Sequence, residues 1–208
     1  ARRLLDEAGF KDTVIIASND LDENIISDLK LQGAQITVWG VGTNLVTARG
    51  NPALDGVYKL SAIKTEEGNW DYRIKLSEQM TKISNPGILQ VRRFKKDQEL
   101  CADVIFDQEI GCEMPCLIVD PMDTSRKKII TEDIDYEDLL QSIFKKGQLV
   151  YKVPKLESIH KNTQKNLAQF HQGIKRFINP HQYVVGMEEK LLDLKMELIK
   201  KAREKDIK

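Results

Sequence analysis

The sequence predicts an α/β unit over residues 1–55, a mainly antiparallel β region over 56–120 and a helical region over 121–208. Three patterns lead to this fold class. Two continuous β-branched runs flank a helical pattern near the N-terminus, apolar and polar residues alternate in the middle of the chain, and apolar residues recur every three or four positions in the last third. Buried parallel strands, half-exposed antiparallel strands and amphipathic helices produce these patterns, in that order.

The composition is that of an ordinary globular protein. Of the 208 residues, 41% are hydrophobic and 31% are charged, and the 32 basic residues balance the 32 acidic ones. A chain without net charge lacks the electrostatic footprint of a nucleic-acid or anionic-membrane binder, so we expect neither partner. No apolar run approaches the roughly 20 residues that span a bilayer.

The cysteines indicate a reducing compartment. Cys101, Cys112 and Cys116 are the three cysteines. An odd count argues against a disulfide framework, and their C-x10-C-x3-C spacing does not match a structural zinc site. The N-terminal residues also lack the apolar stretch of a secretory signal. We therefore expect a cytoplasmic protein with no metal site of its own.

The first unit reads as a β-strand, a helix and a second β-strand. Residues 13–18 form a continuous apolar run, which suits a strand buried on both faces. Asp20 followed by Glu23 resembles a capping box, so we expect a helix to start there. Residues 35–39 form the second buried strand. The connection is long enough for a right-handed crossover between parallel strands.

The middle of the chain reads as a small antiparallel layer. Turn residues at 67–69 and 85–87 punctuate it. The expected strands cover residues 56–63, 72–76, 89–94, 103–106 and 116–119. Arg92 and Arg93 lie on one of these half-exposed strands, where charged side chains are normally solvated.

Two apolar stripes predict helices in the last third. Residues at helical spacing repeat before and after the break at 179–180. The first stripe is Leu156, Ile159, Thr163, Leu167, Phe170 and Ile174, and the second is Met187, Leu191, Leu194 and Leu198.

Two loops that follow the predicted parallel strands are the candidate ligand site. Residues 18–20 (Ser18, Asn19 and Asp20) lead into a helix N-terminus, whose free N–H groups favour an anion. Residues 40–43 supply Gly40, Gly42 and Thr43, and such a loop can form a nest of N–H donors with a hydroxyl at its rim. Each loop alone also suits a tight turn or a helix cap. Together, at the carboxyl ends of adjacent parallel strands, they predict a phosphate site.

Several blocks of the chain together resemble a known family. They are residues 15–23 (IIASNDLDE), 38–47 (VWGVGTNLVT), 52–60 (PALDGVYKL), 75–77 (KLS), 85–87 (NPG), 154–159 (PKLESI) and 179–183 (NPHQY). In this order they resemble the C-terminal half of nicotinate phosphoribosyltransferase.

The resemblance implies a reaction, a fold and a role for the glycine loop. Enzymes of the family couple nicotinate to 5-phosphoribosyl 1-diphosphate in NAD salvage, which gives nicotinate mononucleotide and pyrophosphate, with Mg²⁺ and ATP hydrolysis assisting. The fold implied is an incomplete α/β (TIM-like) barrel joined to a mainly β domain, commonly in a homodimer. Gly40, Gly42 and Thr43 would hold the phosphoribosyl group, with Ser18, Asn19 and Asp20 lining the same pocket.

The chain departs from the family pattern in its length. Family members are roughly twice as long, and their base-binding arginine, phosphorylated histidine and acidic diphosphate loop belong to the half that has no counterpart here. We therefore expect this chain to be a fragment that is inactive by itself. We assign no catalytic residue in it. The alternatives are a non-catalytic phosphate-binding or interaction module and a related nicotinamide or quinolinate phosphoribosyltransferase.

Overall fold

The computed structural model describes residues 1–53, 56–131 and 134–205. The chain forms two compact units, Ala1–Val57 and Tyr58–Lys208. The predicted boundary at residue 55 lies outside the described residues, as do residues 54–55 of the third resembling block.

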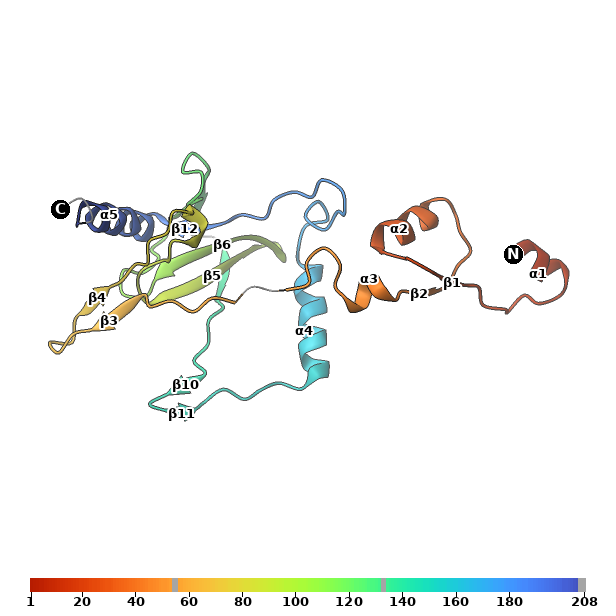
Figure 1. The fold of residues 1–208 in the computed structure, drawn as a ribbon, viewed down its shortest axis with the longest axis horizontal. Helices are drawn as coiled ribbons and strands as arrows, with labels where there is room; N and C mark the ends of the chain where they lie inside the picture. Colours follow the sequence, from red (N-terminus) through yellow and green to blue (C-terminus); the bar gives the residue numbers. More distant parts are fainter. Residues whose placement is uncertain (54–55, 132–133, 206–208) are drawn as a thin grey trace. The chain divides into compact units, whose positions relative to one another are not determined.

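The first unit contains the predicted βαβ element. Strands β1 and β2 pair in parallel, with Ile16 opposite Val38 and Ser18 opposite Gly40, and helix α2 connects them (Figure 1). The expectation of a parallel strand pair joined by a helix is confirmed. The elements are α1 (Arg2–Glu7), β1 (Ile16–Ser18), α2 (Glu23–Leu31), β2 (Val38–Gly40) and α3 (Thr43–Val46).

The prediction that these two strands are buried on both faces was wrong for this unit. Ile16 is 65% exposed and Val38 is 42% exposed, and Leu21 is the buried hydrophobic residue that the unit contributes within the described chain. Two strands and one nine-residue helix are too few to cover both faces of a parallel sheet. The apolar pattern therefore fits a larger sheet than the two strands seen here.

The second unit is built on a six-stranded sheet in the order β8-β7-β12-β6-β5-β9. Strand β12 lies between β6 and β7, parallel to the first and antiparallel to the second. At Gly186 of β12 an added Cβ would lie 2.5 Å from the carbonyl oxygen of Val119, so the close approach requires glycine. The strands are β5 (Leu89–Lys96), β6 (Glu99–Asp107), β7 (Cys116–Val119), β8 (Lys127–Ile130), β9 (Asp135–Asp138) and β12 (Val185–Glu188).

Smaller elements complete the unit. Strands β3 and β4 form an antiparallel hairpin whose turn includes the predicted Gly68, and β10 and β11 form a second hairpin. The remaining bounds are β3 (Ala62–Lys64), β4 (Trp70–Tyr72), the 3₁₀ turn η1 (Met80–Lys82), β10 (Phe144–Lys145), β11 (Gln148–Leu149), α4 (Leu156–Ala168) and α5 (Glu189–Lys205).

The structure differs from the sequence interpretation in the last third. Besides α4 and α5, residues 121–208 contribute the strands β8 to β12, and the main sheet combines strands from both sides of residue 120. Met187, expected on a helical stripe, lies in β12, and Phe170 and Ile174 follow the end of α4. Met187 lies just before α5, and its spacing from Leu191 matches a helix by chance. For this reason the short strand β12 was missed.

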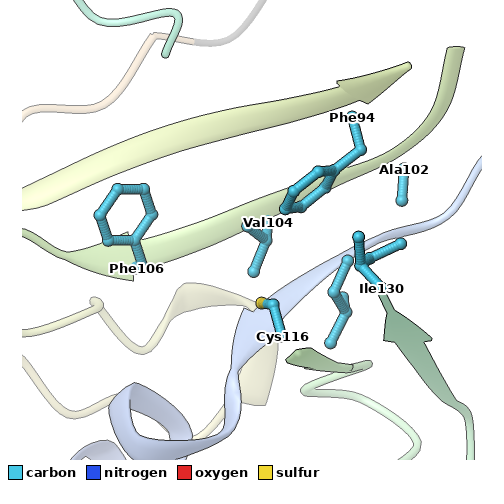
Figure 2. Packing of buried hydrophobic residues seen from close by; sticks show 7 residues of the cluster. Phe94, Ala102, Val104, Phe106, Cys116 and Ile130 are labelled. Carbon is cyan, nitrogen blue, oxygen red and sulfur yellow. The ribbon is translucent and has the colours of Figure 1, made fainter. Parts of the chain in front are cut away.

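Each face of the main sheet has its own core. One core gathers alternate residues of four strands, and Figure 2 shows Phe94, Val104, Cys116 and Ile130 converging on it. The four strands are β8 at one edge of the sheet, β7 next to it, and β6 and β5 near the other edge. Since side chains from strands so far apart in the sheet meet in one cluster, the sheet curls around it. The other face packs against α5 through Val119, Met187, Leu191 and Leu192.

Arg92 and Arg93 are paired charges, so the expectation that both are solvated was wrong. Arg92 forms two hydrogen bonds to Asp138, of 2.8 and 3.0 Å, and lies between the rings of Phe106 and Tyr136. Arg93 forms two hydrogen bonds to Asp103, of 2.9 and 2.7 Å. Each pair bridges neighbouring strands of the sheet, where a bidentate guanidinium fixes geometry as well as charge.

The buried carboxylate of Asp107 joins the β3–β4 hairpin to the sheet. Its oxygens accept from the N–H groups of Ile88, Glu109 and Ile110 at 2.6 to 3.0 Å, and from the Tyr72 hydroxyl at 3.2 Å. Gly87 packs so closely that an added Cβ would lie in van der Waals conflict with a carboxylate oxygen. Four donors stabilise a charge that has no exposed surface.

We expect Asp107→Asn to destabilise the second unit by about 2–4 kcal/mol, because an amide presents N–H donors to backbone N–H groups that need an acceptor. Urea unfolding can be followed by Trp70 fluorescence in a Trp39→Phe background, since these are the two tryptophans. The exposed Glu109→Gln in the same turn is the matched control and should change stability by less than about 0.5 kcal/mol. Equal effects of the two substitutions would contradict the role of Asp107.

The raised pKa of Tyr72 leads us to expect a loss of stability at alkaline pH. Its burial, and next the negative charge of Asp107, raise the pKa of Tyr72 from 10.0 to about 12. The folded state therefore holds this proton more tightly than the unfolded chain, and the stabilisation present below pH 10 is lost as the pH rises to about 12. Between these pH values the unfolding free energy of Tyr72→Phe should fall less steeply than that of the wild type. Parallel pH profiles for the two proteins would exclude this linkage.

Candidate functional site

The two predicted loops lie at the same edge of the parallel strand pair. Ser18 ends β1 and Gly40 ends β2, and the two residues are partners in the strand register. An added Cβ on Gly40 would lie 3.1 Å from the Cβ of Ser18, so glycine here permits close approach of the two strand ends. The parallel register therefore brings Ser18 and Gly40 together, as the sequence predicted.

The first loop bends sharply before α2. Asn19 and Asp20 have φ values of 85° and 47°, in the left-handed region that Asn and Asp adopt more readily than most residues. The expected capping box at Asp20 was wrong. Asp22 caps α2 instead, and its carboxylate accepts from the N–H of Ile25 at 2.8 Å. Asp20 thus remains in the loop, two residues before the helix cap.

The second loop leads directly into α3. Gly42 is the N-cap of this four-residue helix and Thr43 is its first residue. The backbone N–H groups of Thr43 and Asn44 donate to no backbone oxygen in the described part of the chain. An added Cβ on Gly42 would meet no atom within 4 Å. The loop therefore offers unpaired donors next to open space.

Asn44 connects the two loops, a role that the sequence analysis did not assign. Its Nδ2 donates to the carbonyl oxygen of Leu21 at 2.9 Å and lies 3.4 Å from that of Asp20. Its Oδ1 accepts from Arg49 at 3.2 Å, which fixes the orientation of the amide. The side chain thereby holds the end of the first loop against the start of α3. Asn44 follows the glycine loop directly in sequence, and that adjacency was the available signal.

The charge balance of the site is mixed. Asp20, Asp22 and Glu23 place carboxylates at the first loop, and Arg49 brings a guanidinium beside the second. An anion bound here would depend on the N–H groups of the glycine loop and on Arg49, since the carboxylates of the first loop repel it. Among the described residues, no three His, Cys, Asp or Glu side chains come close enough to form a metal site.

Two histidines belong to the second unit. The rings of His171 and His181 are parallel with a centroid distance of 6.3 Å, and an added Cβ on Gly173 would lie 2.5 Å from Nδ1 of His181. Cys112 and Cys116 also lie in the second unit, beside the sheet core. Over the part of the chain that the structure describes, none of the helices is both long and apolar enough to cross a bilayer.

The first unit has the arrangement in which α/β proteins commonly place a ligand site, with two loops at the carboxyl ends of adjacent parallel strands. Comparisons with known proteins are more specific. A sequence profile for the nicotinate phosphoribosyltransferase C-terminal domain matches residues 89–195. The chain therefore belongs to the nicotinate phosphoribosyltransferase family, through its C-terminal domain.

Relatives from bacteria and eukaryotes agree. The nicotinate phosphoribosyltransferase of Bacillus subtilis (strain 168) is 38% identical over 203 residues, which cover 96% of this chain and 41% of the relative. The Dictyostelium discoideum enzyme is 33% identical over 197 residues, covering 88% of this chain and 32% of the relative. The chain thus spans well under half the length of these relatives.

A solved structure shares the fold. The crystal structure of human nicotinic acid phosphoribosyltransferase superposes with a TM-score of 0.62 at 21% sequence identity. The match covers 95% of this chain and 36% of the human one. It shows that this chain and the human enzyme have the same fold over the matched region.

We expect Asn44→Asp to loosen the connection between the loops, because a carboxylate cannot donate to the carbonyls of Asp20 and Leu21. Backbone amides of residues 21–23 should exchange with solvent several-fold faster, as a lost hydrogen bond of about 1 kcal/mol implies. Hydrogen exchange measured by mass spectrometry tests this. Gln35→Glu, an amide-to-carboxylate change at an exposed side chain of the same unit, should leave these amides unchanged.

Proposed function

We propose that this chain supplies the phosphoribosyl-binding part of a nicotinate phosphoribosyltransferase. The complete enzyme would join nicotinate to 5-phosphoribosyl 1-diphosphate and release nicotinate mononucleotide and pyrophosphate. The observation that carries the proposal is the register of β1 and β2, which places Ser18 beside Gly40 and brings both loops to one edge. Membership of the family supports the phosphate of a phosphoribosyl group as the ligand of this edge.

The loops would position the substrate. The N–H groups of Thr43 and Asn44 and the hydroxyl of Thr43 would bind the 5-phosphate, Gly42 would leave space for it, and Gly40 would allow the strand ends to approach. Ser18, Asn19 and Asp20 would line the facing side of the pocket. Substitution at the ribose carbon passes through a cationic state, so the main tasks are positioning and charge stabilisation.

The exposed strands of the first unit support a place within a larger barrel. Ile16 and Val38 are apolar and exposed, and parallel strands are normally covered on both faces. In the proposal, β1 and β2 belong to an incomplete α/β barrel whose other strands come from an N-terminal half of the enzyme. That half would bind nicotinate, and two such chains would form a homodimer.

Mg²⁺ and ATP would assist the complete enzyme in this proposal. Among the described residues, no three metal-ligating side chains come together. We assign no residue and no reaction step to either. The reaction would take place in the cytoplasm, in agreement with the three unpaired cysteines.

We expect Thr43→Ala in the complete enzyme to weaken 5-phosphoribosyl 1-diphosphate binding roughly ten- to a hundred-fold, because a hydrogen bond to a charged group contributes about 1.5–3 kcal/mol. Titration calorimetry with this substrate measures the dissociation constant directly. Thr37→Ala, which removes a hydroxyl from the loop before β2, is the matched control and should bind normally. Unchanged affinity in Thr43→Ala would refute the assignment of the glycine loop.

A second experiment tests the whole function. The chain is assayed for nicotinate mononucleotide formation alone and together with the N-terminal half of a relative, with nicotinamide and quinolinate as competing bases. We expect turnover only with both halves present, and with nicotinate preferred. Substantial turnover by the chain alone would contradict the proposed division of the active site.

A further inference from the structure

Cys112 and Cys116 bring two free thiols into contact beside the sheet core. Their sulfur atoms are 3.0 Å apart. A disulfide requires about 2.05 Å, so the sulfurs need to approach by only about 1 Å. Cys116 is 1% exposed, whereas Cys112 is partly exposed, so a small oxidant in solvent reaches Cys112 first.

Both cysteines are held by the surrounding structure. Cys116 begins β7 and is paired in register with Ile130 of β8. Cys112 follows the turn anchored by Asp107, whose carbonyl oxygen accepts from the N–H of Gly111 at 2.8 Å. On the other side, Arg92 donates to the carbonyl oxygen of Cys112 at 3.4 Å. The contact between the thiols therefore does not depend on a freely moving loop.

The hydrogen bond between the two thiols shifts their pKa values in opposite directions, down for Cys112 and up for Cys116. Hydrogen bonding to the Cys116 thiol lowers the pKa of Cys112, and the positive charge of Arg92 acts in the same direction, against burial and the carboxylates of Glu188 and Asp138. Hydrogen bonding to Cys112, followed by burial, raises the pKa of Cys116. Burial also raises the pKa of Cys101. The lowered pKa of Cys112 and its partial exposure make it the first of the two thiols to react.

We propose that Cys112 and Cys116 form a peroxide-oxidised dithiol site, in which Cys112 reacts first and Cys116 closes an intramolecular disulfide. The proposal rests on the geometry of the second unit and is independent of the phosphoribosyl site. It assigns a function to residues that the proposed enzyme activity does not use.

The chemistry balances with hydrogen peroxide as the oxidant. The Cys112 thiolate attacks one peroxide oxygen, an S–O bond forms, the O–O bond breaks, and the departing hydroxide takes up a proton to become water. Cys116 then loses its proton and attacks the Cys112 sulfur, so that the S–S bond forms and the S–O bond breaks with release of a second water. The two thiols lose two electrons, which reduce one peroxide to two waters.

The test treats the folded chain with hydrogen peroxide, stops the reaction with catalase and alkylates the remaining thiols after unfolding. We expect three alkylated cysteines before treatment and one, Cys101, after it, with recovery of all three on addition of dithiothreitol. Cleavage after Glu109 and Glu113 separates the two cysteines, so the disulfide appears as two peptides joined covalently.

Single variants identify the roles within the pair. Cys101→Ser is the matched control and should still lose both of its thiols. Cys112→Ser should keep its two thiols, and Cys116→Ser should accumulate a sulfenic acid at Cys112 that dimedone labels. The peptide mapping of the unsubstituted chain stands even where a variant fails to fold. Two alkylatable thiols at 112 and 116 after treatment, or a disulfide that includes Cys101 or a second chain, would overturn the proposal.

Discussion

The second unit depends on the buried carboxylate of Asp107. A charge with no exposed surface is tolerated because three backbone N–H groups and one hydroxyl donate to it. One side chain thereby fixes the β3–β4 hairpin, the turn at Gly87 and the segment that leads to Cys112. In the first unit the amide of Asn44 plays a similar but weaker part, because it connects the two loops that follow β1 and β2.

Much of the architecture could be predicted from the sequence where the local pattern and the environment agree. The βαβ element was found because its strands lie in continuous apolar runs, the pattern of buried parallel strands, although Ile16 is exposed in the two-stranded sheet of this unit. Strand β12 was missed because four residues beside a long helix do not show their own period, and its pairing with β6 comes from a distant segment. Such long-range pairing leaves no local signal.

In the candidate site, too, local sequence patterns predicted some features, whereas others depend on the three-dimensional structure. Strand ends followed by Ser-Asn-Asp and Gly-x-Gly-Thr predicted which residues meet, and the parallel register is sufficient to bring Ser18 and Gly40 together. The helix cap at Asp22 and the contacts of Asn44 depend on dihedral angles and side-chain geometry, which spacing alone does not determine. Arg92 and Arg93 were misread for a related reason, because their acidic partners lie on neighbouring strands.

The central place of β12 has a consequence for how the chain folds during synthesis. Residues 185–188 fill the gap between β6 and β7, so the hairpins on either side can form early but cannot join into one sheet until this late segment leaves the ribosome. Until then β6 and β7 each present an unpaired edge, which is a hazard for aggregation. A chain truncated before β12 would keep most of its strands and still lack a continuous sheet.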